Sequence, residues 1–98
     1  MPDEASRVRE IAKSLAKRHP GRTIEVRVPP FVAIQVGFGD GSTHRRGTPP
    51  NVVEMDAGTF LSLASGELAW DDADPARLRC SGVHSSDLRA AFPLPKSE

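Results

Sequence analysis

The chain has almost none of the residues that small proteins use for covalent or metal-based stabilisation. It contains one cysteine, Cys80, so no disulfide can form within it, and this favours a reducing compartment. Its histidines, His19, His44 and His84, do not show the spacing of a zinc site, which needs three or four convergent ligands. We therefore expect no metal and no cofactor.

Long apolar segments and net charge are also lacking. The longest apolar-rich stretch, residues 31–38, is far shorter than the ~20 residues that cross a bilayer. The N-terminus carries no apolar signal region, so we expect a soluble, cytoplasmic protein without stable membrane insertion. The formal net charge is zero, and no aromatic residues are interleaved with basic ones. Both observations disfavour a nucleic-acid partner.

Patterns of catalytic residues are absent as well. The run Gly37-Phe38-Gly39-Asp40-Gly41 superficially resembles a phosphate-binding loop, but such loops open a helix, and residues 44–50 do not read as one. A hairpin turn is the better interpretation. Cys80 alternates with Leu78 in a strand-like run, which predicts a small buried core residue rather than a nucleophile. We expect that the protein is not an enzyme.

Charge is distributed unevenly between the two halves of the chain. Residues 1–50 hold nine Lys or Arg and five Asp or Glu, whereas residues 51–98 hold four Lys or Arg and eight Asp or Glu. This is typical of two differently charged faces of one domain, and an electrostatically matched partner is the alternative. Ninety-eight residues with 38% hydrophobic side chains predict a single domain with a small core.

Periodicity predicts a helix followed by strands in the first half. Residues 3–18 have apolar side chains at the helical spacing i, i+3, i+4 and i+7, namely Val8, Ile11, Ala12 and Leu15. Alternation then predicts strands at 23–28 and 31–38, separated by Pro29-Pro30, which cannot continue a central ladder. The inner face of the second strand is formed by Val32, Ile34, Val36 and Phe38. A turn at 39–41 predicts a short return strand at 42–46.

The second half predicts a strand, a capped helix and three short elements. Residues 52–55 read as a strand, and Asp56 as the N-cap of a helix that Gly66 ends. A helical turn at 70–73, a strand at 78–81 and a helix at 87–92 follow. We expect Trp70 to be a largely buried anchor between the main helix and the sheet. Helices grouped around five mainly antiparallel strands predict an α+β domain.

Several of these segments resemble the sterol carrier protein type-two superfamily. The resemblance lies in Asp56-Ala57-Gly58-Thr59-Phe60-Leu61-Ser62-Leu63-Ala64-Ser65-Gly66-Glu67-Leu68-Ala69-Trp70 and in Leu78-Arg79-Cys80-Ser81-Gly82. Residues 46–54 resemble the small actinobacterial branch, and the whole match covers most of residues 22–94. It implies a sterol-carrier-like domain over 1–94, with a curved, mostly antiparallel sheet of about five strands and helices on one face. Residues 95–98 are expected to be a disordered tail.

The resemblance also implies a function. It implies a non-catalytic module with a lipid or fatty-acyl ligand in an apolar pocket. The candidate pocket residues are Val32, Ile34, Val36, Phe38, Phe60, Leu63, Trp70, Leu78, Leu88 and Phe92. Most of them must also serve as core, because so small a domain cannot spare much apolar area. The chain lacks the longer C-terminal helix of the eukaryotic carriers, so the pocket can be small, open or absent.

A second hypothesis rests on the basic segment 44–51. Its polar candidates are His44, Arg45, Arg46, Thr48 and Asn51. Cationic side chains beside a rigid Thr-Pro-Pro turn suit a carboxylate, a phosphate or an acidic protein partner. The chain would then be a small interaction or regulatory protein with a collapsed pocket. The alternative is an exposed hairpin whose charges prevent edge-to-edge pairing.

Overall fold

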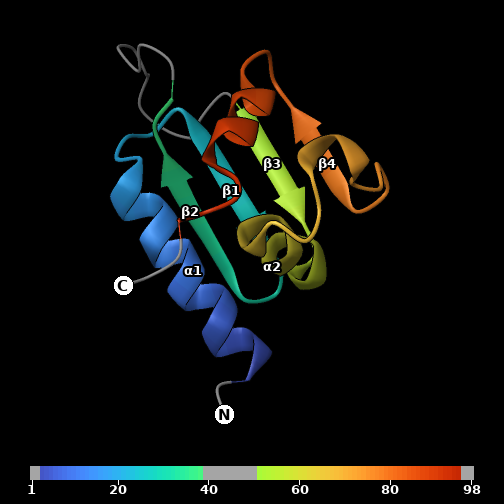
Figure 1. Ribbon diagram of the computed structural model, residues 1–98. Coiled ribbons are helices and arrows are strands. Elements are labelled where there is room, and N and C mark those ends of the chain that lie inside the picture. Colours follow the sequence, from blue (N-terminus) through green and yellow to red (C-terminus); the bar gives the residue numbers. More distant parts are fainter. Residues whose placement is uncertain (1–2, 39–50, 96–98) are drawn as a thin grey trace.

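The computed structural model describes residues 3–38 and 51–95, and the predicted turn at 39–41 and strand at 42–46 lie outside this part of the chain. The described elements form an α+β arrangement (Figure 1). In chain order they are α1 (Glu4–Arg18), β1 (Ile24–Val28), β2 (Val32–Val36), β3 (Asn51–Met55), α2 (Ala57–Ser65), the 3-10 helix η1 (Trp70–Asp72), β4 (Leu78–Ser81) and the 3-10 helix η2 (Ser85–Ala91). The predicted α+β class is therefore confirmed.

The four described strands form one mixed sheet in the order β2-β1-β3-β4. β1 pairs antiparallel with β2, and β3 pairs antiparallel with β4. The central pair, β1 and β3, is parallel, with Ile24 beside Asn51 and Val26 beside Val53. Alternation in the sequence indicates which side chains share a face but not the direction of a strand, so this parallel pair was not predicted.

α1 forms because its apolar residues fall on one face and its ends are capped. The backbone N–H of Ser6 donates to Oδ1 of Asp3 at 2.9 Å, so Asp3 satisfies a free donor of the first turn. Val8, Ala12 and Leu15 are buried against the rest of the domain. The helix ends at Arg18, as the Pro20-Gly21 pair predicts.

α2 has a cap at each end. The N–H of Thr59 donates to Oδ1 of Asp56 at 2.9 Å, and Gly66 adopts a left-handed conformation with φ of 89°. A residue with a side chain is strained at that angle, so Gly66 suits this position. The predicted start and stop of this helix are confirmed.

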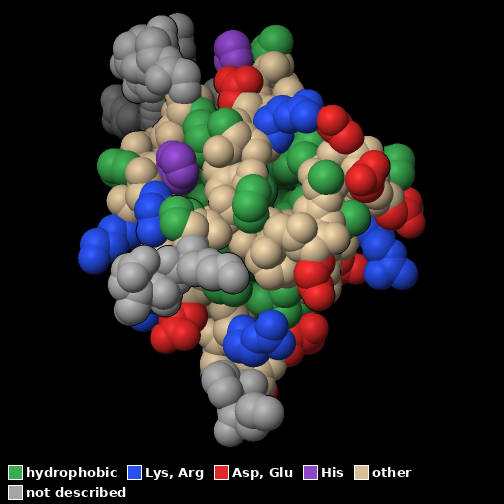
Figure 2. Space-filling model, in the orientation of Figure 1, with side chains coloured by type: hydrophobic (Ala, Val, Ile, Leu, Met, Phe, Trp, Pro, Cys, Tyr) green, Lys and Arg blue, Asp and Glu red, His purple; other side chains and the backbone are tan. Residues whose placement is uncertain are grey.

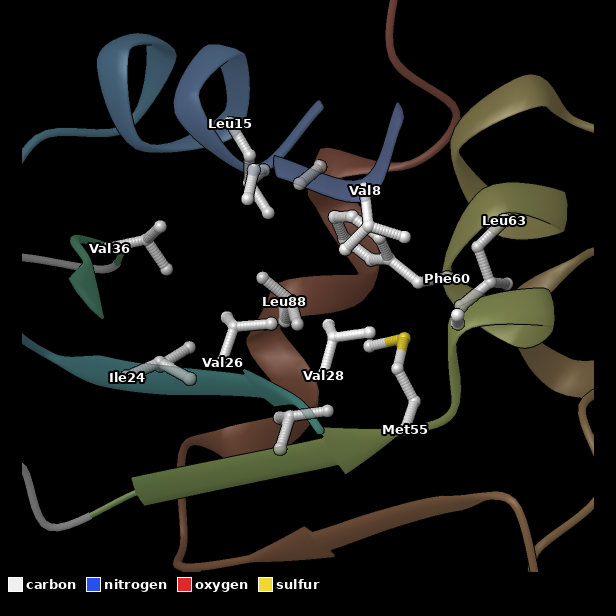
Figure 3. Packing of buried hydrophobic residues seen from close by; sticks show 14 residues of the cluster. Val8, Leu15, Ile24, Val26, Val28, Val36, Met55, Phe60, Leu63 and Leu88 are labelled. Carbon is white, nitrogen blue, oxygen red and sulfur yellow. The ribbon is translucent and has the colours of Figure 1, made fainter. Parts of the chain in front are cut away.

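The helices lie on one face of the sheet and enclose the core (Figure 1). Figure 3 shows Val8, Phe60, Leu63 and Leu88, from α1, α2 and η2, pointing toward one another above the strands. β1 contributes its alternate residues to the same core, all of them fully buried: Ile24, Val26 and Val28.

β2 lies at one end of the sheet formed by the described strands, and its inner face is only partly covered. Val36 is fully buried, whereas Val32 and Ile34 are half-buried, and among the strands of residues 3–38 and 51–95 only β1 pairs with β2. The predicted range 31–38 is too long, since the strand ends at Val36. Phe38 lies beyond it, half-buried, with its ring stacked on His19 at a centroid distance of 4.5 Å.

The other face of the sheet carries no helix among residues 3–38 and 51–95, and it bears charged side chains. Arg27 Nε donates to Glu25 Oε2 at 2.7 Å, and Arg79 Nη2 donates to Glu54 Oε2 at 2.9 Å. Alternate residues of each strand thus separate an apolar face from a charged one.

The C-terminal third is made of short elements. The final helix is a 3-10 helix over Ser85–Ala91 rather than residues 87–92. The prediction that Cys80 is a buried core residue is wrong, because Cys80 is exposed on β4, which lies at the other end of the sheet as described. No helix in the described ranges combines the length and the apolar character needed to cross a membrane.

Candidate functional site

The ten apolar residues predicted to line a pocket lie together on the covered face of the sheet. Four of them are fully buried in the core cluster: Val36, Phe60, Leu63 and Leu88. The other six are partly buried and pack against that cluster: Val32, Ile34, Phe38, Trp70, Leu78 and Phe92. Figure 3 shows the four buried ones in the space between the helices and the sheet. A role for these residues in ligand binding remains a prediction.

Three aromatic rings form a stack at the edge of this cluster. Phe92 lies edge-on to Phe60 at a centroid distance of 6.2 Å and an interplanar angle of 89°. It also stacks on Trp70 at 6.2 Å and 23°. Trp70 is half-buried. Most of its surface is covered, as expected, and its ring packs on Phe92, which follows η2. Its expected place between the main helix and the sheet stays a prediction.

A large groove lies elsewhere, where α1 and α2 meet residues 93–95. Its volume is about 780 Å³, and it is open to solvent on one side. Its lining comes from three segments: Arg7, Glu10, Ile11 and Ser14 of α1; Leu61, Ala64 and Ser65 of α2; and Pro93, Leu94 and Pro95. None of the ten predicted pocket residues lines it.

The groove combines an apolar lining with polar groups. Ile11, Leu61, Ala64 and Leu94 are half-buried or buried, while Arg7 and Glu10 are exposed. The backbone N–H of Leu94 donates to the carbonyl of Ala64 at 3.0 Å and holds the third segment beside α2. Such an arrangement suits an amphiphilic molecule, whose apolar part would contact the lining and whose polar end would contact the guanidinium or the hydroxyls.

Sequence reasoning missed this groove, although a weak signal was present. Ile11 and Leu61 belong to the apolar patterns of α1 and α2, yet both are only half-buried. The edges of two apolar stripes are therefore uncovered where the helices meet. The sequence alone does not show which helices are neighbours.

The polar candidates fall into two groups. His44, Arg45, Arg46 and Thr48 lie outside the described residues. Asn51 begins β3 and is buried, with 2% of its surface exposed. Its Nδ2 donates to the carbonyl of Thr23 at 3.0 Å, and its Oδ1 accepts from the N–H of His84 at 2.9 Å. Asn51 thus joins the residue before β1 to the turn after β4, which is a structural role.

A cluster of acidic side chains lies on another part of the surface. Figure 2 shows acidic side chains gathered at the right of the molecule, over the segment that joins α2 to β4. In the sequence this segment carries Glu67, Asp71, Asp72 and Asp74. Asp71 accepts from Arg89 at 2.8 Å, and Asp74 lies 3.9 Å from Arg77. Basic partners therefore compensate part of this charge.

Reactive groups do not converge among the described residues. No group of three or more His, Cys, Asp or Glu is placed to hold a metal ion in residues 3–38 and 51–95. Although Cys80 is exposed, partial desolvation by neighbouring atoms raises the pKa of its thiol, and a hydrogen bond with Ser85 opposes this effect. His84 Nδ1 lies 3.4 Å from Asp87 Oδ2, and both side chains are exposed to solvent.

The sequence matches a known family along almost its whole length. The model of the family described as Bacterial SCP ortholog, where SCP denotes sterol carrier protein, matches residues 2–94. This range includes every helix and strand named above. No curated protein matches the chain.

Proposed function

Because the chain belongs to the bacterial sterol carrier protein family, we propose that it is a non-catalytic carrier module that binds a lipid or fatty-acyl ligand. The groove between α1, α2 and residues 93–95 is the proposed site. Its partly apolar lining is the observation that carries this choice, because an acyl chain gains about 0.8 kcal/mol for each CH₂ group removed from water.

The dimensions of the groove support a ligand of this size. Pockets for small molecules occupy roughly 300–1,000 Å³, and the groove measures about 780 Å³. Ile11, Leu61 and Leu94 would contact the chain, and Arg7 on the same surface would attract an anionic end group.

A thermal shift series tests the proposal. Saturated fatty acids of increasing length, each below its critical micelle concentration, are added to the ligand-free protein. A ligand at 100 times its Kd stabilises the folded state by about 2.7 kcal/mol. For a domain of this size that gain raises Tm by roughly 10–20 °C. Absence of stabilisation at every chain length would contradict the proposal.

A pair of matched variants tests the location of the site. Ser14 lines the groove, whereas Ser6 lies on the same helix outside it and is exposed. Ser14→Phe places a ring in the groove and should abolish the fatty-acid shift, while Ser6→Phe should preserve it. If both variants kept the full shift, the ligand would bind at another site.

A further inference from the structure

Two side chains of opposite charge lie next to each other in the groove. Among its described lining residues, Arg7 is positive and Glu10 is negative, and all the others are apolar or carry a hydroxyl. Both charged residues belong to α1 and are exposed to solvent. Side chains three positions apart are neighbours on the surface of a helix, with their Cβ atoms about 5–6 Å apart. The groove therefore presents one cation beside one anion.

Neither of these charges has a partner in the described part of the chain. Within residues 3–38 and 51–95, no ion pair includes Arg7 or Glu10. The arginines that follow β3 differ, because each of them contacts a carboxylate: Arg77, Arg79 and Arg89. The guanidinium of Arg7 and the carboxylate of Glu10 can therefore both serve a ligand.

The hydroxyl groups of the groove discriminate less between ligands. Ser65 Oγ donates to the carbonyl of Ser62 at 3.2 Å and accepts from the N–H of Glu67 at 3.3 Å, so it is engaged at the end of α2. Ser14 adds a half-buried hydroxyl, which can donate or accept. The charges of Arg7 and Glu10 are thus the groups that can select the polar end of a ligand.

Opposite charges side by side favour a ligand that carries both signs. An anion near Arg7 and Glu10 is attracted by one and repelled by the other, and at similar distances the two Coulomb energies nearly cancel. A cation meets the same cancellation. A zwitterion that places its anion at Arg7 and its ammonium at Glu10 gains from both contacts, and an ammonium also donates hydrogen bonds to a carboxylate.

We infer that the groove selects an acyl amphiphile with a zwitterionic end group, an inference that rests on the proposed function. The acyl chain lies against Ile11, Leu61 and Leu94. The anionic group contacts the guanidinium of Arg7, and a primary ammonium contacts the carboxylate of Glu10. An ethanolamine phosphate group has this chemistry, because a short ethylene link joins its phosphate to its ammonium.

Two lysophospholipids that differ only in the end group test this inference. Palmitoyl lysophosphatidylethanolamine has a phosphate and an ammonium, whereas palmitoyl lysophosphatidylglycerol has the same chain and phosphate but no ammonium. Isothermal titration calorimetry at low ionic strength, below the critical micelle concentration of each lipid, measures both Kd values. We expect the ethanolamine lipid to bind about two- to fivefold more tightly, which is the gain from one exposed ion pair.

Charge-neutral variants of the two residues locate this preference. Glu10→Gln should bind both lipids with the same Kd, because the ammonium loses its partner and the glycerol lipid loses a repulsion. Arg7→Gln should weaken both lipids about two- to fivefold, since both contain the phosphate. Glu4→Gln and Arg9→Gln are the matched controls, because these residues are exposed on α1 and do not line the groove. Both controls should keep the wild-type preference.

The outcomes separate the zwitterion inference from the carrier function. The inference is overturned if the wild type binds the glycerol lipid as tightly as the ethanolamine lipid or more tightly. It is also overturned if the preference survives in Glu10→Gln, or if Glu4→Gln removes it equally. All these results leave the carrier function in place, as does binding of fatty acids but of neither lysophospholipid. If no fatty acid and neither lysophospholipid binds, both proposals are wrong.

Discussion

The two faces of the sheet are built from different interactions. On the covered face Ile24, Val26 and Val53 are completely buried under the helices, and burial of apolar surface contributes roughly 25 cal/mol per Å². On the uncovered face Arg79 pairs with Glu54 at 2.9 Å, with 66% and 32% of the side chains exposed. Exposed pairs of this kind contribute about 0–1 kcal/mol. The covered face should therefore supply almost all of the stability.

The largest expected effect comes from the centre of the covered face. Phe60→Ala should lower the free energy of unfolding by about 3–5 kcal/mol, since it removes a fully buried ring and leaves a cavity. Urea denaturation followed by circular dichroism measures the loss. Phe31→Ala is the comparison, because Phe31 is only half-buried beside the turn between β1 and β2. Equal losses for the two variants would contradict this view of the core.

A smaller effect is expected at the buried amide of Asn51. Asn51→Ala leaves the carbonyl of Thr23 and the N–H of His84 without their partner. An unsatisfied buried polar group costs about 1–3 kcal/mol. Asn51→Asp keeps an acceptor for His84 but loses the donor to Thr23, so urea denaturation should also show it to be destabilised. If both variants unfolded at the same urea concentration as the wild type, these hydrogen bonds would contribute nothing to stability.

The cap of α2 predicts a dependence of stability on pH. Hydrogen bonds from Thr59 lower the pKa of Asp56 below its usual value; burial opposes them, and Arg77 adds smaller contributions that lower the pKa further. The stabilisation is fully present above the unfolded-state pKa of about 3.9 and is lost as the pH falls through the lower folded-state pKa. Melting curves between about pH 2 and 7 should show this loss.

Substitutions at Asp56 sharpen that test. Asp56→Asn keeps a good N-cap without a titrating group. The Tm of this variant should therefore fall less steeply than that of the wild type as the pH is lowered. Asp56→Ala should cost about 0.5–2 kcal/mol near neutral pH, because the N–H of Thr59 loses its acceptor. An Asp56→Asn profile parallel to the wild-type curve would assign the acid sensitivity to other carboxylates, such as Asp3, whose pKa is also lowered by hydrogen bonding with Ser6.

The smallest effect is expected on the uncovered face. Arg79→Ala should lower the free energy of unfolding by less than about 1 kcal/mol. Added salt screens the ion pair, so the free energies of unfolding of the variant and the wild type should become more similar. Urea denaturation at low and high ionic strength measures both quantities. A loss comparable to that of Phe60→Ala would mean that the charged face contributes far more than exposed ion pairs normally do.

The parts of the fold that depend on neighbouring residues in the chain could be predicted from the sequence. The helical spacing of Val8 and Leu15, the cap at Asp56 and the stop at Gly66 are local features, and the structure confirms them. The parallel pairing of β3 could not be predicted, because alternation is the same for both strand directions. The exposure of Cys80 likewise depends on the position of β4 at one end of the sheet as described, which no local pattern records.

The candidate site was less accessible to sequence reasoning. The resemblance implies a pocket lined by apolar residues of the sheet and helices, and these residues pack into the core or against it. The groove arises where two helices far apart in the sequence meet Pro93 and Leu94. Its lining therefore depends on tertiary packing, which a period of 3.6 residues cannot reveal.

The parallel pair at the centre of the sheet has a consequence for how the chain folds. β1 and β2 pair across a turn at residues 29–31, whereas Ile24 of β1 pairs with Asn51 of β3, which is much farther along the chain. The entropy lost on closing a loop grows with its length, and contacts between distant residues slow folding. We therefore expect the β1–β2 hairpin to form first and the docking of β3 onto it to limit the rate. Substitutions in β3 should then slow folding, while those in η2 should mainly accelerate unfolding, as stopped-flow measurements in urea would show.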